Sequence, residues 1–316
     1  NFKNLFLFAF FGAILTCARI NGIFLIMSFL AFYLLSILPN EKKFNSFLLI
    51  FSFIIFYCFI VVIFWPYLWS NPIENFIFAY KYFSNFPLHP KMLFNGEYIW
   101  SHYLPNSYIF TWIFITTPIL YTVLFIIGYF QIFKRFFLRF INIKEKKDYN
   151  DFWRGVSEKK DLFIFFNLTI IALLLVIFSI PLYNGWRHVY FLNVFLIYIS
   201  IVGFYQIGIY LKNKFKKNFH YHISILFLIT VIYKMIVYHP FQNIYFNNYF
   251  NEISHLNFEI DHGGISGARS LKEILAIEKN KNKIKVGVAS WLPLQRSVRL
   301  LDKADREKIQ IVGQEF

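Results

Sequence analysis

Long apolar runs separated by short polar segments are the most regular feature of the chain. A helix needs about 20 predominantly apolar residues to span the hydrocarbon core of a membrane. Runs of this kind lie at residues 4–18, 22–38, 46–65, 109–133, 162–182, 191–211 and 223–238. The first and last runs are short and the middle five are longer, so the pattern predicts a helical polytopic membrane protein with six to seven spans.

The polar segments between these runs differ in their positive charge. The segments 39–45, 134–161 and 212–222 carry fifteen Lys and Arg residues, whereas 66–108 and 183–190 carry three. Lys and Arg accumulate on the cytoplasmic side of membrane proteins. We therefore expect the three basic segments on the cytoplasmic side of the plasma (inner) membrane. The two segments with few cations, and everything after residue 239, are expected on its outer side.

The outer segment 66–108 is long and aromatic. Its stretch 73–83 has the residue pattern of a helix, and Trp65, Trp69 and Trp100 flank it. Tryptophan suits the membrane–water interface because one edge of its ring is apolar and the other is polar. We expect an interfacial helix on the outer leaflet. An enzyme that handles a lipid-borne substrate has a use for such a helix, whereas a channel has little.

After Pro240 the composition changes, and charged residues of both signs become frequent. The predicted elements there are a helix at 270–277, a strand at 283–288, a helix at 302–309 and a strand at 309–312. This alternation favours a small extracytoplasmic α/β segment. The predicted domains are a multi-spanning domain at 1–250 and this segment at 251–316. The segment is expected to be cut short, and the chain to have lost its N-terminus.

Overall composition agrees with a membrane protein and narrows its chemistry. Hydrophobic residues make up 58% of the chain and charged residues 16%, against about 25% charged in soluble domains. The net charge of +15 could suggest nucleic acid, but most cations fall in the short segments between runs, so no nucleic-acid partner is expected. Cys17 and Cys58 both lie in apolar runs, which excludes a disulfide framework and a cysteine-based metal site.

Four polar clusters fall at the predicted outer ends of the spans. Arg19 separates the first two runs; it suits a phosphate through its fork of donors, or it extends to lipid headgroups. The cluster 65–72, at the outer end of a span, is a second candidate; its alternative role is to end the helix and to place aromatic rings at the membrane interface. In 96–105, His102 and Glu97 can titrate or contact a sugar, or His102 is an ordinary hydrogen-bonded loop residue.

The fourth cluster, 184–190, is the most compact. Arg187 and His188 are adjacent in a short outer turn and can form an anion or hydroxyl site, and Trp186 offers a ring face for a sugar or a cation. The alternative is an aromatic anchor at the interface. The chain has no Walker loop, dinucleotide-binding glycine turn, zinc-protease helix or nucleophile elbow.

The clusters and two further segments occur in a fixed order along the chain. They are Ala18-Arg19-Ile20-Asn21-Gly22, Trp65-Pro66-Tyr67-Leu68-Trp69, Trp100-Ser101-His102-Tyr103-Leu104-Pro105 with Thr117-Pro118, Gly185-Trp186-Arg187-His188-Val189-Tyr190-Phe191, His239-Pro240-Phe241-Gln242-Asn243-Ile244-Tyr245-Phe246-Asn247 and Phe258-Glu259-Ile260-Asp261. This series resembles bacterial multi-spanning glycosyltransferases of the GT-C class, in the protein-mannosyltransferase-like family 39 group. The resemblance covers about residues 10–265, and its most specific part is the segment 239–247.

The resemblance implies sugar transfer at the outer membrane face from a polyprenyl-phosphate donor. In that class a carboxylate on the first outer loop is the general base, and this loop is expected upstream of residue 1, so the catalytic residue stays unassigned. Arg19 and Arg187 are the expected phosphate ligands, with His188 assisting. The substrate-binding candidates together are Arg19, His102, Tyr103, Trp186, Arg187, His188 and His239. The sequence does not decide whether a divalent metal ion is a cofactor, and no metal ligands can be assigned from it.

The alternative function is that of a non-enzymatic transporter or polysaccharide-export component. A polymerase or ligase of surface glycans is a third hypothesis. Transporters have paired broken helices and ionisable groups at the bilayer midplane. Here the apolar runs are nearly free of charge and the polar residues gather at their outer ends. This distribution favours an enzyme with its site at the membrane surface.

Overall fold

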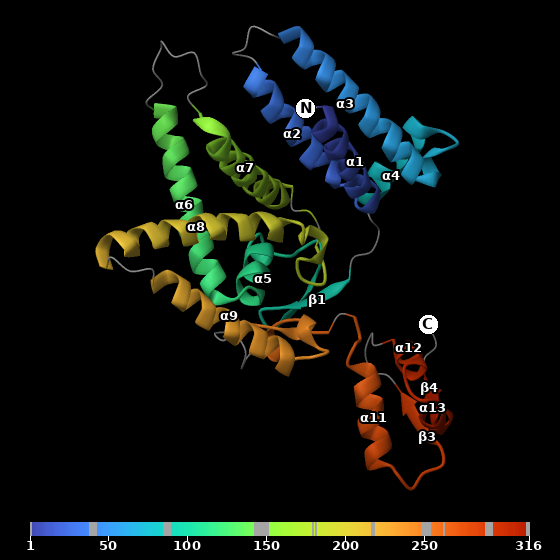
Figure 1. Ribbon diagram of the computed structural model, residues 1–316. Coiled ribbons are helices and arrows are strands. Elements are labelled where there is room, and N and C mark those ends of the chain that lie inside the picture. Colours follow the sequence, from blue (N-terminus) through green and yellow to red (C-terminus); the bar gives the residue numbers. More distant parts are fainter. Residues whose placement is uncertain are drawn as a thin grey trace. The chain divides into compact units, whose positions relative to one another are not determined.

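The computed structural model describes residues 2–37, 43–84, 90–141, 152–178, 180, 182–215, 219–247, 254–261, 263–287 and 293–313 (Figure 1). The chain divides into two compact units. Unit 1 consists of Asn1–His89, Tyr121–Ile180 and Val189–Lys217, and unit 2 of Pro90–Leu120, Pro181–His188 and Asn218–Phe316.

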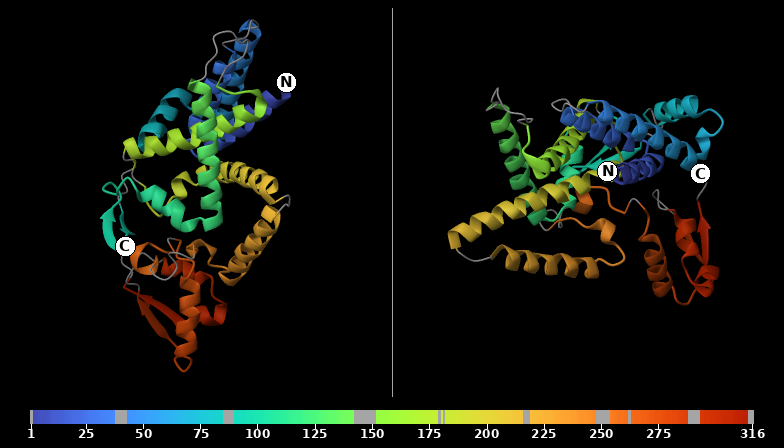
Figure 2. Two further views of the ribbon diagram at one scale, coloured as in Figure 1. Left: turned by 90° about the vertical axis from the view of Figure 1, so that its left-hand side faces the viewer. Right: turned by 45° about the horizontal axis from the view of Figure 1, so that its top comes forward.

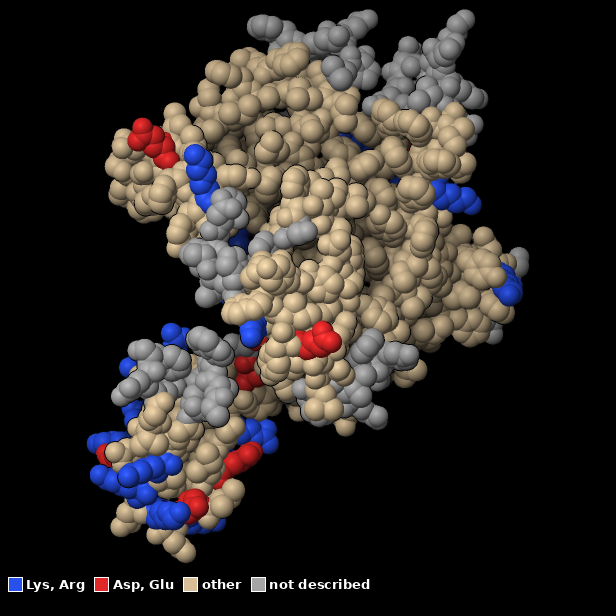
Figure 3. Space-filling view, turned by 180° about the vertical axis from the view of Figure 1, so that it is seen from behind, with Lys and Arg blue, Asp and Glu red and all other residues tan. Residues whose placement is uncertain are grey.

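The predicted class is confirmed at the level of a helical, multi-pass membrane protein. Within the described part of the chain, five helices are long and apolar enough to cross a membrane. They are α3 (Lys43–Phe64), α6 (Ile119–Ile141), α7 (Gly155–Ile177), α8 (Leu192–Phe215) and α9 (Phe219–Val237). Two further apolar helices, α1 (Phe2–Ala18) and α2 (Gly22–Ile37), are shorter. Seen as a space-filling surface, charged side chains cluster over the C-terminal lobe and are sparse over the helices (Figure 3).

In unit 1, α1 packs along α3 because α1 has small residues at the contact (Figures 1 and 2). Ala9 and Ala13 are fully buried there and lie against Phe53 and Tyr57 of α3. Thr16 Oγ1 and the Tyr57 hydroxyl share a hydrogen bond of 2.7 Å. Small residues and polar bridges of this kind drive helix association where lipid removes the hydrophobic incentive.

After α3 come η1 (Pro66–Leu68) and α4 (Pro72–Ser84). The helix α4 covers the stretch 73–83 predicted as helical, so that element is confirmed. Its apolar side chains are largely exposed, with Ile73 at 76% and Phe78 at 61%. Its location at the membrane interface stays a prediction.

The backbones of α6 and α8 approach each other closely where the two helices cross. A Cβ added to Gly128 of α6 would lie 2.0 Å from the Ile199 carbonyl oxygen, and one added to Gly203 of α8 would lie 1.9 Å from the Leu124 carbonyl oxygen. Ser200 Oγ also donates to the Tyr121 carbonyl oxygen at 3.1 Å. The two backbones therefore touch where neither helix has a side chain.

The run 109–133 was predicted to be one span, and this was wrong. The chain forms α5 (Tyr108–Thr116), breaks at Thr117 and continues as α6. Thr117 is extended, with φ −98° and ψ 134°, because the ring of Pro118 excludes the helical conformation from the residue before it. Hydrophobicity is continuous across this break, so the apolar pattern alone hid it.

Unit 2 begins with a hairpin that the sequence reading missed, β1 (Lys91–Phe94) paired antiparallel with β2 (Glu97–Trp100). Asn95 and Gly96 form its two-residue turn with φ of 53° and 85°. An Asn-Gly pair between short apolar runs is the usual signal for such a turn.

The C-terminal part of unit 2 contains α10 (Ser254–Asn257), α11 (Gly267–Ile277), β3 (Ile284–Gly287), α12 (Leu294–Arg299), α13 (Lys303–Lys308) and β4 (Ile309–Val312). The strands pair in parallel, with Ile284 opposite Ile309. Leu271, Leu294 and Leu301 form the core that joins helices and sheet. The helices at 270–277 and 302–309 and both strands match the predicted positions, whereas the six-residue α12 was missed. The predicted extracytoplasmic location and the division at residue 250 stay predictions.

Candidate functional site

Helix α5 is the centre of the candidate site in unit 2. Tyr108, Trp112 and Thr116 follow one another at four-residue spacing, which places them on one face of the helix. Tyr108 and Trp112 are each only 3% exposed. Segments from three distant parts of the sequence contact this helix.

The turn 183–188 is the first of these segments. The Gly185 backbone N–H donates to the Tyr108 hydroxyl oxygen at 3.0 Å, and the Trp186 indole Nε1–H donates to Thr116 Oγ1 at 3.0 Å. A Cβ added to Gly185 would lie 3.4 Å from the Trp112 ring. The turn is therefore fixed to α5 through its backbone and through one buried side chain.

Burial changes the role expected of Trp186. Its residue is 7% exposed and its N–H is already bonded. Little of the ring is left for a sugar or a cation to contact. We therefore assign to Trp186 the role of anchoring the turn. This role resembles the alternative of an aromatic anchor at the membrane interface, except that the ring packs against protein rather than lipid.

Arg187 and His188 follow this anchor in the turn. Arg187 is exposed, and its guanidinium carbon lies 5.1 Å from the centre of the Tyr183 ring. Its Nε–H donates to His188 Nε2 at 3.4 Å, and the His188 and Tyr183 rings are 4.4 Å apart. Across the described residues, no carboxylate forms an ion pair with Arg187. Its terminal nitrogens are available to an anion.

The segment 239–247 contacts the C-terminal end of α5. Asn247 is 1% exposed, and its side-chain amide donates to the carbonyl oxygens of Phe114 at 2.7 Å and Thr117 at 3.3 Å. Its backbone N–H donates to the Ile115 carbonyl oxygen at 2.8 Å. Asn247 therefore satisfies carbonyls left open where the helix stops before Pro118. Sequence reasoning did not select it, because an asparagine in an aromatic segment carries no distinctive signal.

His239, at the other end of this segment, is exposed. Its Nδ1 lies 3.0 Å from the Gln242 side-chain amide nitrogen, which also donates to the Met235 carbonyl oxygen at 3.1 Å. The side chain is thus oriented locally by its own segment.

The third segment is 258–261, in which the centre of the Phe258 ring lies 5.7 Å from that of Trp112 in α5. Asp261 is at its end. Burial alone would raise the pKa of this carboxyl, but hydrogen bonds from the Ser266 side chain, from the backbone N–H groups of Ser266 and Ile265, and from the Asn243 amide hold it below its usual value. The carboxylate therefore holds residues 265 and 266, which lie immediately before α11, and both of its oxygens accept hydrogen bonds.

The hairpin brings His102 and Tyr103 into the same unit. Phe94 of the hairpin stacks near Tyr108 at 5.0 Å and Phe258 at 5.8 Å between ring centres. His102 and Tyr103 are both exposed, with their rings 4.1 Å apart. They form an aromatic pair at the surface.

Arg19 is exposed and belongs to unit 1. The other predicted substrate-binding residues, His102, Tyr103, Trp186, Arg187, His188 and His239, belong to unit 2. A contribution from Arg19 stays a prediction.

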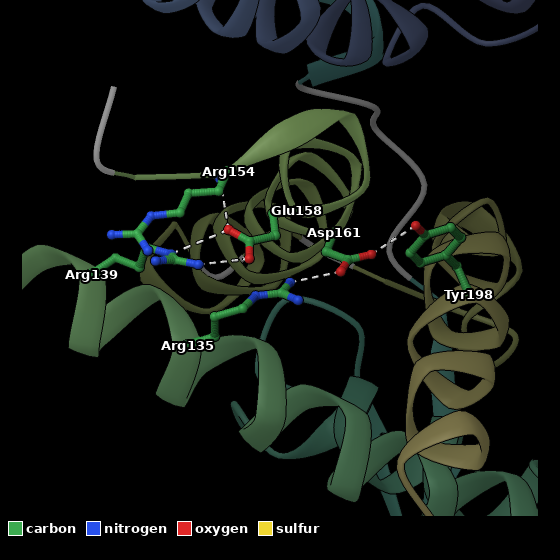
Figure 4. A network of polar contacts seen from close by, with 6 residues as sticks. All are labelled: Arg135, Arg139, Arg154, Glu158, Asp161 and Tyr198. Atoms are coloured by element: carbon green, nitrogen blue, oxygen red, sulfur yellow. Dashed lines mark hydrogen bonds and ion pairs between the residues drawn. The ribbon is translucent and has the colours of Figure 1, made fainter. Parts of the chain in front are cut away.

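Unit 1 contains a charged network that the sequence reading missed (Figure 4). Asp161 of α7 accepts hydrogen bonds from Arg135 Nη2 at 2.6 Å and from the Tyr198 hydroxyl at 2.8 Å. Arg139 binds both oxygens of Glu158, at 2.7 and 3.2 Å. These arginines were interpreted as loop cations in 134–161, but α6 extends to Ile141 and α7 begins at Gly155. The apolar helices are therefore less free of charge than the sequence suggested.

In the part of the chain that the structure describes, no group of His, Cys, Asp and Glu could hold a metal ion. Comparison with known proteins adds no assignment, because no family model, curated protein or solved structure matches the chain.

Proposed function

We propose that the chain transfers a sugar from a polyprenyl-phosphate donor to an acceptor hydroxyl at the outer face of the plasma membrane, as glycosyltransferases of the GT-C class do. The single observation that carries the proposal is the environment of Arg187. Its guanidinium is exposed and without a carboxylate partner among the described residues, on a turn that is otherwise anchored. An arginine held in this way suits a phosphate group.

The ordered segments of the resemblance give a second line of support. The turn 183–188 and the segment 239–247 lie far from α5 in sequence, yet both bond to it, and the hairpin that precedes α5 packs Phe94 against Tyr108. Their convergence favours a common site.

Chemically, sugar transfer from such a donor releases a phosphate, whose negative charge must be stabilised as the bond to the sugar breaks. Arg187 would bind that phosphate, and His188 would orient the Arg187 side chain. The acceptor hydroxyl needs a general base, and the structure offers no assignment for it. In this proposal unit 2 carries the outer face of the site, and the C-terminal segment is extracytoplasmic.

The test is donor binding and transfer by the protein in lipid nanodiscs. A photoreactive polyprenyl phosphate should label the protein, and the matching polyprenyl alcohol should label it far less. Arg187→Ala should weaken phosphate labelling by about tenfold or more, since hydrogen bonds to charged groups contribute about 1.5–3 kcal/mol. It should also abolish transfer of radiolabelled sugar, while membrane insertion is unchanged.

Arg269→Ala is the matched control, because Arg269 is also an exposed arginine near an aromatic ring. Equal labelling by alcohol and phosphate, or normal transfer by Arg187→Ala, would contradict the proposal.

A transporter remains the second candidate, on two specific observations. The break at Thr117 interrupts an apolar run, and Asp161 is an ionisable residue buried in a helix bundle. Both features occur in transporters. Substrate-dependent movement of charge across proteoliposomes, lost in Asp161→Asn, would support transport, and its absence alongside sugar transfer would exclude it.

A further inference from the structure

Tyr183 is a residue of unit 2 that the sequence reading did not select. Its half-buried ring faces the Arg187 guanidinium at 5.1 Å and the His188 ring at 4.4 Å. A guanidinium within about 6 Å of an aromatic ring centre is attracted by the electron-rich face of the ring. Tyr183 therefore contacts both polar residues of the turn.

The backbone explains this contact. Asn184 and Gly185 both have left-handed conformations, with φ of 56° and 69°, which asparagine and glycine tolerate better than other residues. Two such residues in succession reverse the chain and return Tyr183 toward Arg187 and His188. The bonds from Gly185 and Trp186 to α5 then fix this reversal.

The contact determines which part of Arg187 is open. The ring occupies one face of the guanidinium, and the Nε–H is used by His188 Nε2. The terminal Nη groups are left, and they form the edge that binds two phosphate oxygens at once. A long side chain that is already oriented also loses less conformational freedom when it binds a ligand.

We propose that Tyr183 is a positioning residue that holds Arg187 ready for a phosphate group. This inference rests on the proposed function and extends it, because it names the residue that makes Arg187 selective for phosphate. The phosphate could belong to a polyprenyl lipid or be free in solution, and the experiment separates these sources.

The experiment measures labelling of the full chain in nanodiscs by photoreactive polyprenyl phosphate, with inorganic phosphate as competitor. Tyr183→Phe keeps the ring and should bind like the unmodified protein. Tyr183→Leu should bind about threefold to tenfold more weakly, the range expected for a cation–π contact. Competition by inorganic phosphate at millimolar concentration would indicate free phosphate as the ligand, and its absence would indicate the lipid-borne one.

A double-mutant cycle separates positioning from a general structural effect. In an Arg187→Ala background, Tyr183→Leu should cause no further loss, because its effect passes through Arg187. Tyr98→Leu, at a hairpin tyrosine that is 73% exposed, is the control and should leave labelling unchanged.

Several outcomes would overturn the inference. Full binding by Tyr183→Leu, equal loss with and without Arg187, or strong loss in Tyr183→Phe would each remove the positioning role. These results are distinguishable from failure of the proposed function, in which Arg187→Ala itself would have no effect on phosphate labelling.

Discussion

Arg135 and Arg139 of unit 1 and Arg187 of unit 2 use their guanidinium groups in opposite ways. In unit 1, Arg135 and Arg139 are bonded to carboxylates, and the Asp161 side chain that receives Arg135 is only 8% exposed. In unit 2, Arg187 is exposed and is held by an aromatic ring and an imidazole, with no acidic partner among the described residues. The first arrangement uses up the guanidinium, whereas the second orients it and leaves it open.

The difference separates structural charge from charge available to a ligand. In a buried ion pair, the attraction between the two charges offsets the free-energy cost of removing them from water, and the pair joins the helices that carry it. An exposed arginine without a carboxylate contributes little to stability and gains a favourable partner only when an anion arrives. Substitutions in the unit 1 network should therefore change stability, and substitutions in the turn should change ligand binding.

The largest expected effect is at the glycine crossing that brings α6 and α8 together beside the network. Gly128→Ala would place a Cβ 2.0 Å from the Ile199 carbonyl oxygen. Backbone atoms cannot yield as side chains do, so the helices must separate, and we expect a loss of about 4 kcal/mol or more in the free energy of unfolding. Denaturation in detergent, followed by circular dichroism, measures it.

Gly12→Ala provides the control for this substitution. Its added Cβ would meet the Ile26 Cδ1 atom at 2.4 Å, which is the end of a flexible side chain and can rotate away. The loss should be below about 1 kcal/mol. Equal stability of the two variants would mean that the close crossing does not hold α6 to α8.

The next effect is loss of Asp161. Asp161→Ala leaves Arg135 and the Tyr198 hydroxyl without their acceptor. Removing one partner of a buried pair costs about 3–5 kcal/mol, and we expect about 3 because the Arg135 side chain is 27% exposed and can reach water. The double variant Asp161→Leu with Arg135→Leu should recover much of the loss. If the double variant is as unstable as Asp161→Ala, the charge itself is not the cause.

The sequence predicted the parts of the fold that depend on local pattern. Apolar runs located the long helices, because the bilayer requires a fixed length of apolar chain. The helix at 73–83 and the strands at 283–288 and 309–312 followed from residue pattern in the same way. The break at Thr117 was hidden because both sides of Pro118 are apolar, although the proline itself was a signal that could have been weighed.

The site was only partly predictable, for a physical reason. Arg187 and His188 were selected because adjacent polar groups at the end of an apolar run are unusual. Asn247 acts through a contact with Phe114, 133 positions away, which no local pattern encodes. Tyr183 lies only four residues from Arg187, and the Asn184-Gly185 pair between them was a local signal for the reversal. The Asp161 network was missed because its partners Arg135 and Tyr198 are distant in sequence. From the sequence alone, an Asp next to an apolar run indicates only the end of a membrane span.

A smaller effect is expected at Asp261, whose carboxylate is satisfied by N–H and O–H donors rather than by an arginine. Its pKa is lowered on folding, so its contribution is fully present above the ordinary pKa of Asp, about 3.9. The contribution is lost as the pH falls through the lower folded value. Asp261→Ala should cost about 1 kcal/mol at neutral pH, and progressively less as the pH falls through the folded pKa.

Proteolysis of the C-terminal segment across a pH series from 7 downward measures this contribution. The unmodified protein should lose protection around α11 as the pH falls, whereas Asp261→Ala should be cleaved readily throughout the series. The same protection in both proteins at pH 7 would rule out a stabilising role for Asp261.

The smallest effect concerns Arg269, which combines features of both arrangements. Its guanidinium carbon lies 5.6 Å from the centre of the Phe241 ring, as Arg187 lies near Tyr183, but its Nε also pairs with Glu273 at 3.3 Å. Both charged side chains are 66% exposed, so Arg269→Ala should change stability by less than about 0.5 kcal/mol. It should leave polyprenyl-phosphate labelling intact, because the Glu273 carboxylate beside Arg269 already balances its charge and repels a phosphate. Glu273→Ala then gives the sharper result: if an aromatic ring and an arginine without a carboxylate partner are sufficient, it should create new labelling near Arg269. If labelling stays confined to the turn, the anchoring of that turn on α5 is also required, and Arg187 is selective because its surroundings are rigid.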